Sequence, residues 1–368
     1  MCENLKKLNE EVPRANSLAL GKVVLEMELT SETLTYASSV DGTQPLLADV
    51  AFAANGRPKP LLLVMHGYRG SRADVAQDLR ELSARGVVAL APDLRGLGGS
   101  AGKWDSGGLD VHDILDAVLA ALRRYPGEID PCNLNLVGYS GGGGNAIACM
   151  VRFPDLFQNT ISFFGISDYG GWYRSGGRPD CNQVMEAALG GTPDTLLETF
   201  AARNAITAAA NARCGRLHFF WDQEETMCPP AMIEAFLAER ARAGAEWSAP
   251  RVHVSKPGDA RRWIHDYRGG NPDLSAADEL FLPDVLAPKP HSPRLPPVGR
   301  LVVPGYLVTR RFQVWLGDGQ RGRAVIEYDC RGPVPKVAVV ENPGGFTVRV
   351  EPFSLLASLP GSHDTNGG

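Results

Sequence analysis

The sequence "LNLVGYSGGGGNAIACM", residues 134–150, is the most informative about the fold, because it joins a strand to a helix through a single serine. The apolar run at 134–137 predicts a buried strand, and residues 145–151 have the composition of a helix start. Ser140 therefore stands on the turn between them, directly before four consecutive glycines. A sharp turn of this kind strains the central residue and lifts its side chain above the carboxyl edge of the sheet.

The turn matches the pattern G-x-S-x-G over residues 138–142, in the strand and helix context that the pattern requires. We interpret Ser140 as a nucleophile, with the partial positive charge of the helix N-terminus beside it. The alternative is a glycine-rich phosphate loop. That alternative is disfavoured because the pattern G-x-x-x-x-G-K-[ST] is absent and no lysine follows.

The composition is that of a globular chain large enough for one α/β domain and an appendage. The chain has 368 residues, 44% of them hydrophobic, with a formal net charge of -5. No stretch concentrates Lys and Arg, so we expect no nucleic-acid partner. No apolar run approaches the roughly 18 residues that a membrane helix needs, so we expect no membrane partner.

The termini and the cysteines bear on the cellular compartment. Residues 1–15 lack a continuous apolar segment, so we expect a cytoplasmic protein, or a secreted one if a signal peptide has been removed. The seven cysteines show no CxxC spacing, which argues against a metal site and against a disulfide framework.

Strand and helix patterns alternate along residues 22–285, which we predict to form the catalytic domain. Residues 22–54 alternate in strand fashion and predict an antiparallel opening. Residues 111–122 place their apolar side chains on one stripe of a helix. The later strands are apolar on both faces, as a parallel sheet covered by helices requires; they lie at 61–67, 87–93, 133–138, 161–165, 217–222 and 251–255. We therefore expect a doubly wound, mostly parallel α/β sheet.

Composition also divides the rest of the chain. Prolines from residue 283 onward predict the end of both helix and central strand. Beyond them, alternating runs around two glycine-containing turns predict a small β-rich appendage of about four strands in two hairpins. We favour a structural role for this appendage over polymer binding or oligomerisation. The expected parts outside the catalytic core are an N-terminal arm (1–21), a cap-like insertion (166–211), a proline-rich linker (286–299), the appendage (300–358) and a disordered tail (359–368).

A serine hydroxyl needs a base to activate it and an acid to orient that base. When the nucleophile lies in a turn of this kind, the chain order is serine, acid, histidine. Only His265 fits, because it lies in the loop after the last predicted strand. The other histidines precede the serine, lie inside predicted strands, or lie in the linker and tail: His66, His112, His218, His253, His291 and His363.

Three carboxylates follow the strand at 217–222, and one of them is expected to orient His265. In hydrolases with this pattern the acid commonly stands four residues before a helix-opening proline. That register selects Glu225, four residues before Pro229. Asp222, directly at the strand end, is the alternative.

Two backbone N–H groups are expected to stabilise the oxyanion of the tetrahedral intermediate. One belongs to Gly141, directly after the nucleophile, and the other to Tyr68, in the turn after the strand at 61–67. The alternative for the second group is a tight turn without a catalytic role. Trp172 and Tyr173, in the insertion, are candidates for the wall of a substrate pocket, and core packing is their alternative role.

Several motifs within residues 45–270 are those of a known superfamily: "HGYRGS", "APDLRGLGGSAG", "DVHDILDAV", "GYSGGG", "GISDYGGWY" and "WDQEETMCPPAMIEAF". With these motifs the chain resembles the α/β-hydrolase superfamily, and within it the prolyl-oligopeptidase-like and dienelactone-hydrolase-like enzymes. The resemblance implies a triad of Ser140, His265 and an acid, with no metal and no cofactor. A glutamate at position 225 differs from the commoner aspartate.

The motifs determine the substrate class less directly than they determine the catalytic residues. Peptidases of the prolyl-oligopeptidase type look as if they need a β-propeller before the catalytic domain, whereas only about sixty residues precede the strand at 61–67 here. Ester hydrolysis is also less demanding, because an alkoxide leaves more readily than an amine. We therefore expect a serine carboxylesterase acting on a small or polymer-borne ester. The alternatives are a serine peptidase or amidase with the same triad, and a non-catalytic binding protein with the same fold.

Overall fold

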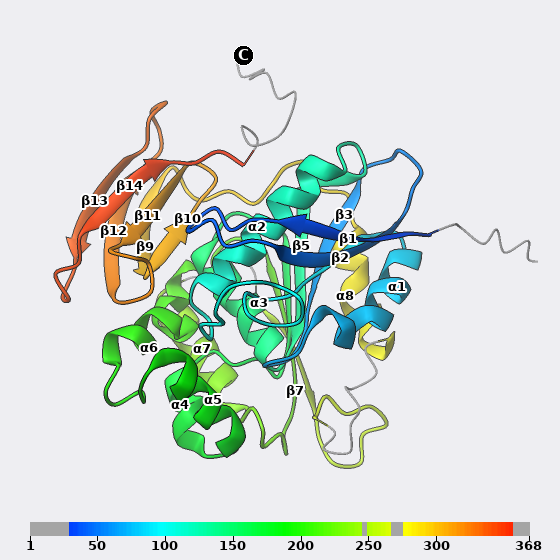
Figure 1. Cartoon of the computed structure of the whole chain (residues 1–368), viewed down its shortest axis with the longest axis horizontal. Helices are drawn as coiled ribbons and strands as arrows, with labels where there is room; N and C mark the ends of the chain where they lie inside the picture. The colour runs from blue at the N-terminus through cyan, green and yellow to red at the C-terminus, as the bar shows by residue number, and fades with distance from the viewer. Residues whose placement is uncertain (1–28, 245–248, 266–274, 356–368) are drawn as a thin grey trace, which may run out of the picture.

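A computed structural model of the chain describes residues 29–244, 249–265 and 275–355 (Figure 1). The predicted arm (1–21) and the predicted tail (359–368) lie outside these residues. Within the described part, none of the helices is long and apolar enough to cross a membrane.

An eight-stranded sheet forms the centre of the molecule, in the order β1-β2-β4-β3-β5-β6-β7-β8 (Figure 1). The β1–β2 and β2–β4 pairs are antiparallel, and the other pairs are parallel. The predicted doubly wound, mostly parallel sheet is therefore confirmed. Its strands are β1 (Leu29–Tyr36), β2 (Leu46–Ala53), β3 (Lys59–Met65), β4 (Val88–Pro92), β5 (Ile129–Tyr139), β6 (Asn159–Phe163), β7 (Arg216–Asp222) and β8 (Arg251–Ser255).

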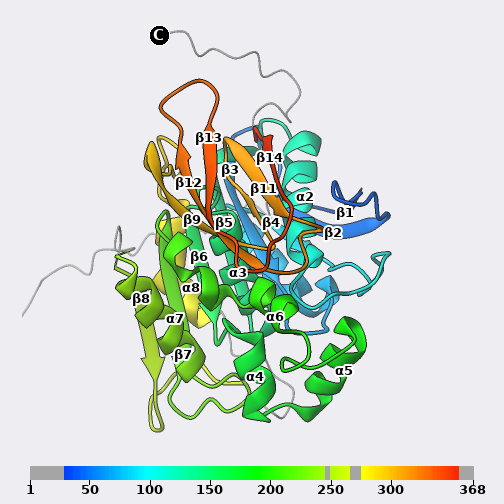
Figure 2. The ribbon, with the colours of Figure 1, turned by 90° about the vertical axis from the view of Figure 1, so that its left-hand side faces the viewer.

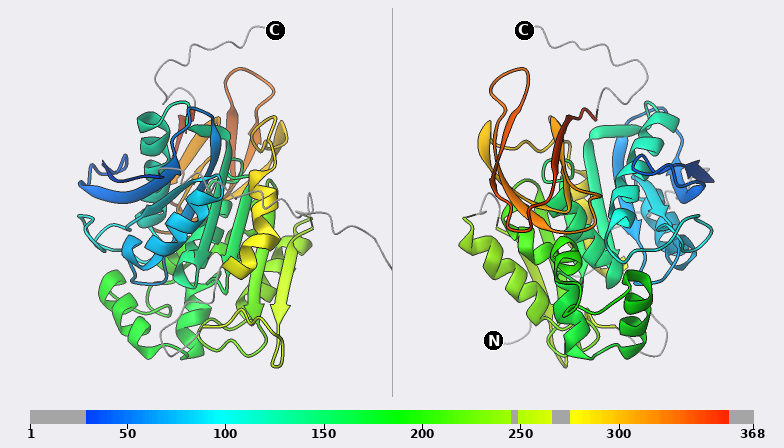
Figure 3. Two further views of the ribbon diagram at one scale, coloured as in Figure 1. Left: turned by 90° about the vertical axis from the view of Figure 1, so that its right-hand side faces the viewer. Right: turned by 60° about the vertical axis from the view of Figure 1, so that its left-hand side comes forward.

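Helices cover both faces of this sheet, and their apolar sides form the core with it. One face packs against α2 and α3, and the other face packs against α1 and α8 (Figure 3, left). Strand β4 is buried along its whole length, which is why its sequence is apolar without alternation. The covering helices are η1 (Arg72–Val75), α1 (Ala76–Ala84), α2 (Leu109–Arg124), α3 (Gly141–Arg152), α7 (Ala231–Arg242) and α8 (Ser275–Leu286).

The helix α8 differs from the expectation that helical structure ends at residue 283. Pro283 lies inside the helix, which continues to Leu286. Phe281 and Val285 are completely buried in the core beneath the sheet. This packing outweighs the hydrogen bond that the proline nitrogen cannot donate.

The insertion between β6 and β7 is helical and lies at the end of the sheet where β5 gives way to α3 (Figure 2). Its first helix begins after Asp168, whose side chain accepts a hydrogen bond from Gly171 N and so caps the helix. The helices of the insertion are α4 (Tyr169–Ser175), α5 (Pro179–Leu189), α6 (Leu197–Arg203) and η2 (Ala205–Asn211).

The C-terminal appendage is a pair of three-stranded antiparallel sheets, ordered β10-β11-β14 and β13-β12-β9 (Figure 2). The two predicted hairpins are wrong, because the strands on either side of each turn belong to different sheets. A buried cluster with side chains from both sheets explains this crossing, since each turn carries the chain across the cluster. The strands are β9 (Val298–Pro304), β10 (Tyr306–Val308), β11 (Phe312–Leu316), β12 (Arg323–Asp329), β13 (Lys336–Glu341) and β14 (Val348–Pro352).

The appendage shares a core with the α/β domain. Tyr306, Val308 and Trp315 belong to the same buried cluster as α2 and the central strands. Its first strand, β9, begins at Val298, inside the stretch predicted as a linker (286–299). Tyr306 on β10 and Trp315 on β11 are thus buried against the α/β domain.

Candidate active site

Ser140 occupies a strained turn between β5 and α3, here called the nucleophile elbow (residues 138–142). Its φ is 52° and its ψ is -119°, in the region that residues with a side chain rarely adopt. Two backbone hydrogen bonds hold it there, from Ser140 N to Phe163 O and from Gly144 N to Ser140 O, both 2.9 Å long. The hydroxyl is half-buried at the carboxyl edge of the sheet.

The glycines after Ser140 are explained by how closely the backbone approaches its neighbours. A Cβ added at Gly141 would lie 2.6 Å from Tyr68 N, and a Cβ at Gly142 would overlap the Met65 carbonyl oxygen. The next two glycines face β6 and the residues that follow it in the same way. Only glycine lets α3 start this close to the sheet, so the glycine run is a packing requirement of the elbow.

His265 lies at the end of the segment after β8, here called the histidine loop (residues 256–265). Its Nδ1 lies 3.0 Å from Glu225 Oε2, with the imidazole tilted away from the direction of a hydrogen bond. The same carboxylate oxygen accepts the backbone N–H of His265 at 2.8 Å. The structure thus brings His265 together with Glu225, the first choice for the acid.

Glu225 is buried, with 3% of its surface exposed, and its carboxylate is fully engaged. Its second oxygen accepts the N–H groups of Met227 at 2.7 Å and Cys228 at 3.1 Å. Burial acts to raise the pKa of Glu225, but the imidazole of His265 and the donated N–H groups outweigh it and lower the pKa below the usual value. The group is therefore a carboxylate at neutral pH.

Asp222, the alternative acid, has other partners. It accepts hydrogen bonds from Ser255 Oγ at 2.7 Å and from Arg262 Nε at 2.8 Å. The Arg262 guanidinium is the main reason that the pKa of Asp222 falls to about 2. Ser255 Oγ in turn accepts the N–H of Trp263, so Asp222 anchors the histidine loop two residues before His265.

The hydroxyl of Ser140 and the imidazole of His265 are not hydrogen-bonded to each other. Among the described residues His265 Nε2 has no hydrogen-bond partner, and its ring packs against Phe164 with centroids 4.1 Å apart. Ser140 Oγ lies instead 3.7 Å from Cys228 Sγ. Such bonds are often formed only once a substrate is bound.

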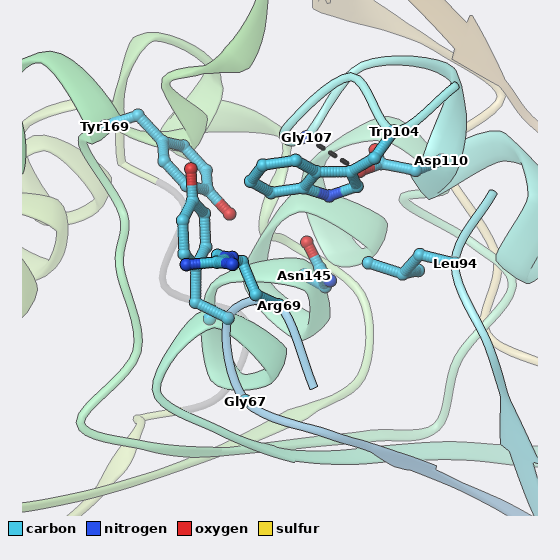
Figure 4. A pocket seen from close by; sticks show the side chains of 10 residues that line it. Gly67, Arg69, Leu94, Trp104, Gly107, Asp110, Asn145 and Tyr169 are labelled. Atoms are coloured by element: carbon cyan, nitrogen blue, oxygen red, sulfur yellow. Dashed lines mark hydrogen bonds between the residues drawn. The ribbon is translucent and has the colours of Figure 1, made fainter. Parts of the chain in front are cut away.

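The expected oxyanion donors meet beside the elbow. Tyr68 N lies close to Gly141, and both residues line one small cavity. Figure 4 shows other side chains of this cavity, among them Trp104, Asn145 and Tyr169. The phenol of Tyr68 bonds to Ser106 Oγ at 2.8 Å, and its ring packs edge-on against Trp104. The cavity is lined by Gly67, Tyr68, Arg69, Leu94, Trp104, Gly107, Asp110, Gly141, Asn145 and Tyr169.

Trp172 and Tyr173, the candidates for a substrate-pocket wall, do not line this cavity. Trp172 is 2% exposed and donates from Nε1 to Met227 O at 2.6 Å, which ties α4 to the segment around Glu225. Tyr173 is half-buried and donates to Glu186 on α5. A role of these side chains in substrate binding stays a prediction.

Three neighbours of the site carry no sequence signal that would have identified them. Cys228 touches the nucleophile, Phe164 touches the imidazole, and Arg262 binds the alternative acid. Phe164 also has a positive φ of 37°. Only the three-dimensional arrangement relates these residues to the site, because they come from three separate loops.

Part of the chain matches a known protein family. The prolyl oligopeptidase family matches residues 73–229, which include Ser140 and Glu225. No curated protein matches the sequence. Similar solved structures are an acylaminoacyl peptidase of Pyrococcus horikoshii (17% identity, TM-score 0.57, 71% of this chain and 42% of that chain), puromycin hydrolase (22%, 0.52, 65% and 36%), and a puromycin-hydrolyzing peptidase of Mycobacterium tuberculosis (19%, 0.53, 70% and 40%).

At these identities the structural likeness establishes the fold, and the chain spans less than half the length of each of these structures. The family match adds the segment that holds the nucleophile elbow and the acid. The chain therefore has the α/β-hydrolase fold, and its residues 73–229 match the prolyl oligopeptidase family.

Proposed function

We propose that the protein is a serine peptidase or amidase that hydrolyses small peptides or aminoacyl amides. One observation carries this proposal: the segment that matches the prolyl oligopeptidase family holds both the strained Ser140 and the carboxylate that contacts His265. The sequence alone favoured carboxylic esters. The family match favours amides, as do the peptidases among the similar structures.

In the proposed reaction, Ser140 Oγ attacks the carbonyl carbon of the scissile bond while His265 Nε2 takes the hydroxyl proton. The imidazole then gives this proton to the leaving nitrogen as the acyl-enzyme forms. Water enters, loses a proton to the same nitrogen of His265, and releases the acid with Ser140 restored. Glu225 stays ionised and stabilises the imidazolium at each stage, which its lowered pKa supports.

The negative charge of the tetrahedral intermediate develops on the carbonyl oxygen. We assign the stabilisation of this charge to the backbone N–H groups of Tyr68 and Gly141, which the close approach of the two backbones supports. Fixed donors of this kind are worth about 3–4 kcal/mol in a water-poor site. The strained φ of Ser140 supports the same arrangement, because it keeps the hydroxyl and the N–H of Gly141 on one side of the turn.

Ester hydrolysis is the second candidate, and it is favoured by His265 Nε2, which has no hydrogen-bond partner within the described part of the chain. An amide needs efficient proton delivery to its leaving nitrogen, whereas an alkoxide or phenoxide leaves with weaker assistance. An imidazole that is not aligned with Ser140 before substrate binding is better suited to the less demanding reaction.

Matched substrates distinguish these functions. Aminoacyl p-nitroanilides and p-nitrophenyl esters of the same acyl group are compared on the wild type and on Ser140→Ala. We expect measurable anilide hydrolysis by the wild type and a loss of at least about 10³-fold in Ser140→Ala. Ester turnover without anilide turnover would support the second candidate. Turnover that survives in Ser140→Ala would refute the nucleophile.

A further inference from the structure

The oxyanion donor Tyr68 rests on the stretch between β4 and α2, here called the support segment (residues 104–110). Trp104 packs edge-on against the Tyr68 ring with centroids 4.9 Å apart, and Ser106 Oγ bonds to the Tyr68 hydroxyl at 2.8 Å. The support segment also lines the cavity beside the two oxyanion donors (Figure 4). The position of Tyr68 therefore depends on where this segment is held.

Buried side chains hold the support segment through hydrogen bonds to its backbone carbonyl groups. The guanidinium of Arg152, on α3, donates to Gly107 O at 2.9 Å, and the hydroxyl of Tyr306, on β10, donates to Gly108 O at 3.1 Å. On α6, Arg203 Nε donates to Asp105 O at 3.0 Å. Arg152, Arg203 and Tyr306 are each at most 2% exposed, so water does not compete for these carbonyls.

The same donors are attached to the appendage. Arg152 Nε also reaches Pro304 O at the end of β9, at 3.4 Å, and its guanidinium lies over the Tyr306 ring, 4.7 Å from the centroid. Arg203 Nη1 donates to Gln320 O at 2.8 Å. The contacts therefore run without interruption from the appendage through two buried cations to the support segment and on to Tyr68.

Burying a guanidinium is costly unless its donors are all satisfied. The guanidinium of Arg152 donates to carbonyl groups of three segments: the support segment, α6, where Nη2 donates to Ala202 O at 2.5 Å, and β9. All three segments must be in place for its donors to be satisfied. The arrangement thus couples the appendage to the segment that positions the oxyanion donor. A cover for a sheet edge would not need this connection.

We propose that the C-terminal appendage braces the oxyanion site, and that Arg152 and Tyr306 are positioning residues for Tyr68. This inference rests on the proposed function, because it assigns the Tyr68 N–H to the oxyanion. A small displacement of such a donor lowers catalysis strongly, since errors of about 1 Å in placement can cost about 10²-fold. The appendage then acts on the chemical step without contacting the substrate.

Two substitutions test the brace with little loss of volume. Tyr306→Phe removes the hydroxyl bonded to Gly108 O and keeps the ring against Arg152. Arg152→Lys keeps the charge but cannot reach the three segments at once. We expect kcat to fall about 3- to 10-fold in Tyr306→Phe and at least about 10-fold in Arg152→Lys, with KM nearly unchanged.

A transition-state analogue separates positioning from a general loss of structure. A trifluoromethyl ketone forms an oxyanion on Ser140, so its inhibition constant should rise by the same factor by which kcat/KM falls. A fluorophosphonate probe labels Ser140 whatever the natural substrate, and its labelling rate should fall in parallel. The melting temperature of each variant is measured alongside.

Matched controls lie in the same appendage. Tyr328→Phe changes a buried tyrosine on β12 that packs on Phe312, away from the support segment. Arg310→Lys weakens the hydrogen bonds from this guanidinium to Asp155 O and Leu156 O, which follow the C-terminal end of α3, whereas the elbow precedes its N-terminal end. We expect both controls to keep the wild-type kcat, inhibition constant and labelling rate.

The outcomes are distinguishable from a failure of the proposed function. If the probe does not label wild-type Ser140, the proposed function is wrong. If the wild type is labelled and active but Arg152→Lys and Tyr306→Phe keep its rates, the brace is refuted. The brace is also refuted if the control variants lose as much activity as the test variants, or if the inhibition constant stays constant while kcat falls.

Discussion

The two halves of the candidate active site are built in different ways. The nucleophile elbow lies in the middle of the sheet, where backbone contacts to β3 and β6 leave no room for a Cβ. The histidine loop follows β8, the edge strand, and side chains hold it: Asp222 with Ser255 and Arg262, and Glu225 with His265. One half is set by close packing of the main chain, and the other half by buried carboxylates.

Because of this difference, we expect substitutions in the two halves to have different effects. Backbone packing tolerates no added atom, so changes at the elbow should act on folding. Side-chain anchors can be weakened one bond at a time, so changes in the histidine loop should act on rate and on pH dependence. The unformed bond between Ser140 and His265 lies where the two halves meet.

Gly142→Ala should have the largest effect. The added methyl overlaps the carbonyl oxygens of Met65 and His66, both of them backbone atoms that cannot move without shifting β3. We expect a loss of at least about 3 kcal/mol in the free energy of unfolding, or no soluble protein. Urea unfolding measures it. Gly67→Ala is the control, because a Cβ there meets nothing within 4 Å; equal losses in both variants would contradict the packing argument.

Glu225→Gln should come next and should act on rate. The amide cannot stabilise the imidazolium, and the corresponding change in a serine protease triad costs about 10⁴-fold in kcat. We expect a loss of about 10²- to 10⁴-fold with a melting temperature close to that of the wild type. Glu224→Gln is the matched control, because that side chain is exposed and forms an ion pair with Arg262 instead of contacting His265. A Glu225→Gln variant that keeps wild-type kcat would remove Glu225 from the mechanism.

Asp222→Asn should have a smaller effect on rate, about 10-fold or less, and a pH-dependent effect on stability. The folded-state pKa of Asp222 is about 2, below the unfolded value near 3.8, so its stabilisation is present above the unfolded pKa and lost as the pH falls through the folded pKa. The variant should therefore lose about 1–3 kcal/mol equally at pH 8 and pH 5. Urea unfolding at pH 8, 5 and 3 should show the difference from wild type shrinking only at the lowest pH.

Cys228→Ala should have the smallest effect. The thiol is the neighbour of Ser140 Oγ at 3.7 Å, and burial raises the pKa of Cys228 so far that it stays a neutral thiol. We expect kcat/KM within about threefold of the wild type, because a weak sulfur contact contributes little. A fall of more than tenfold, with unchanged unfolding, would mean that the thiol helps to orient the nucleophile.

The two halves also differ in how far the sequence alone could predict them. The nucleophile elbow could be predicted because its backbone requires glycine at several positions. Gly138 and residues 141–144 identify the turn, the helix start and the nucleophile in the sequence. The apolar strands and the stripe at 111–122 were readable for the same reason, since burial on one or both faces leaves a periodic pattern.

The histidine loop was harder to predict, because the carboxylates and arginines that hold it are residue types that usually lie on the surface. The sequence kept both Asp222 and Glu225 as acids, and the partner of each appears only when β7, β8 and their loops are placed together. The two hairpins of the appendage were predicted wrongly for a related reason. Strand, turn and strand indicate a local hairpin, but a buried cluster between two sheets makes each strand pair with a distant one instead.

The shared core of the α/β domain and the appendage has a consequence for biosynthesis. Tyr306, Val308 and Trp315 complete the cluster beneath α2, so the α/β domain cannot close this cluster while only its own residues have left the ribosome. The nascent chain must keep apolar surface exposed until Trp315 has been translated. A chain cut before that point should fail to become a smaller enzyme and should bind chaperones instead.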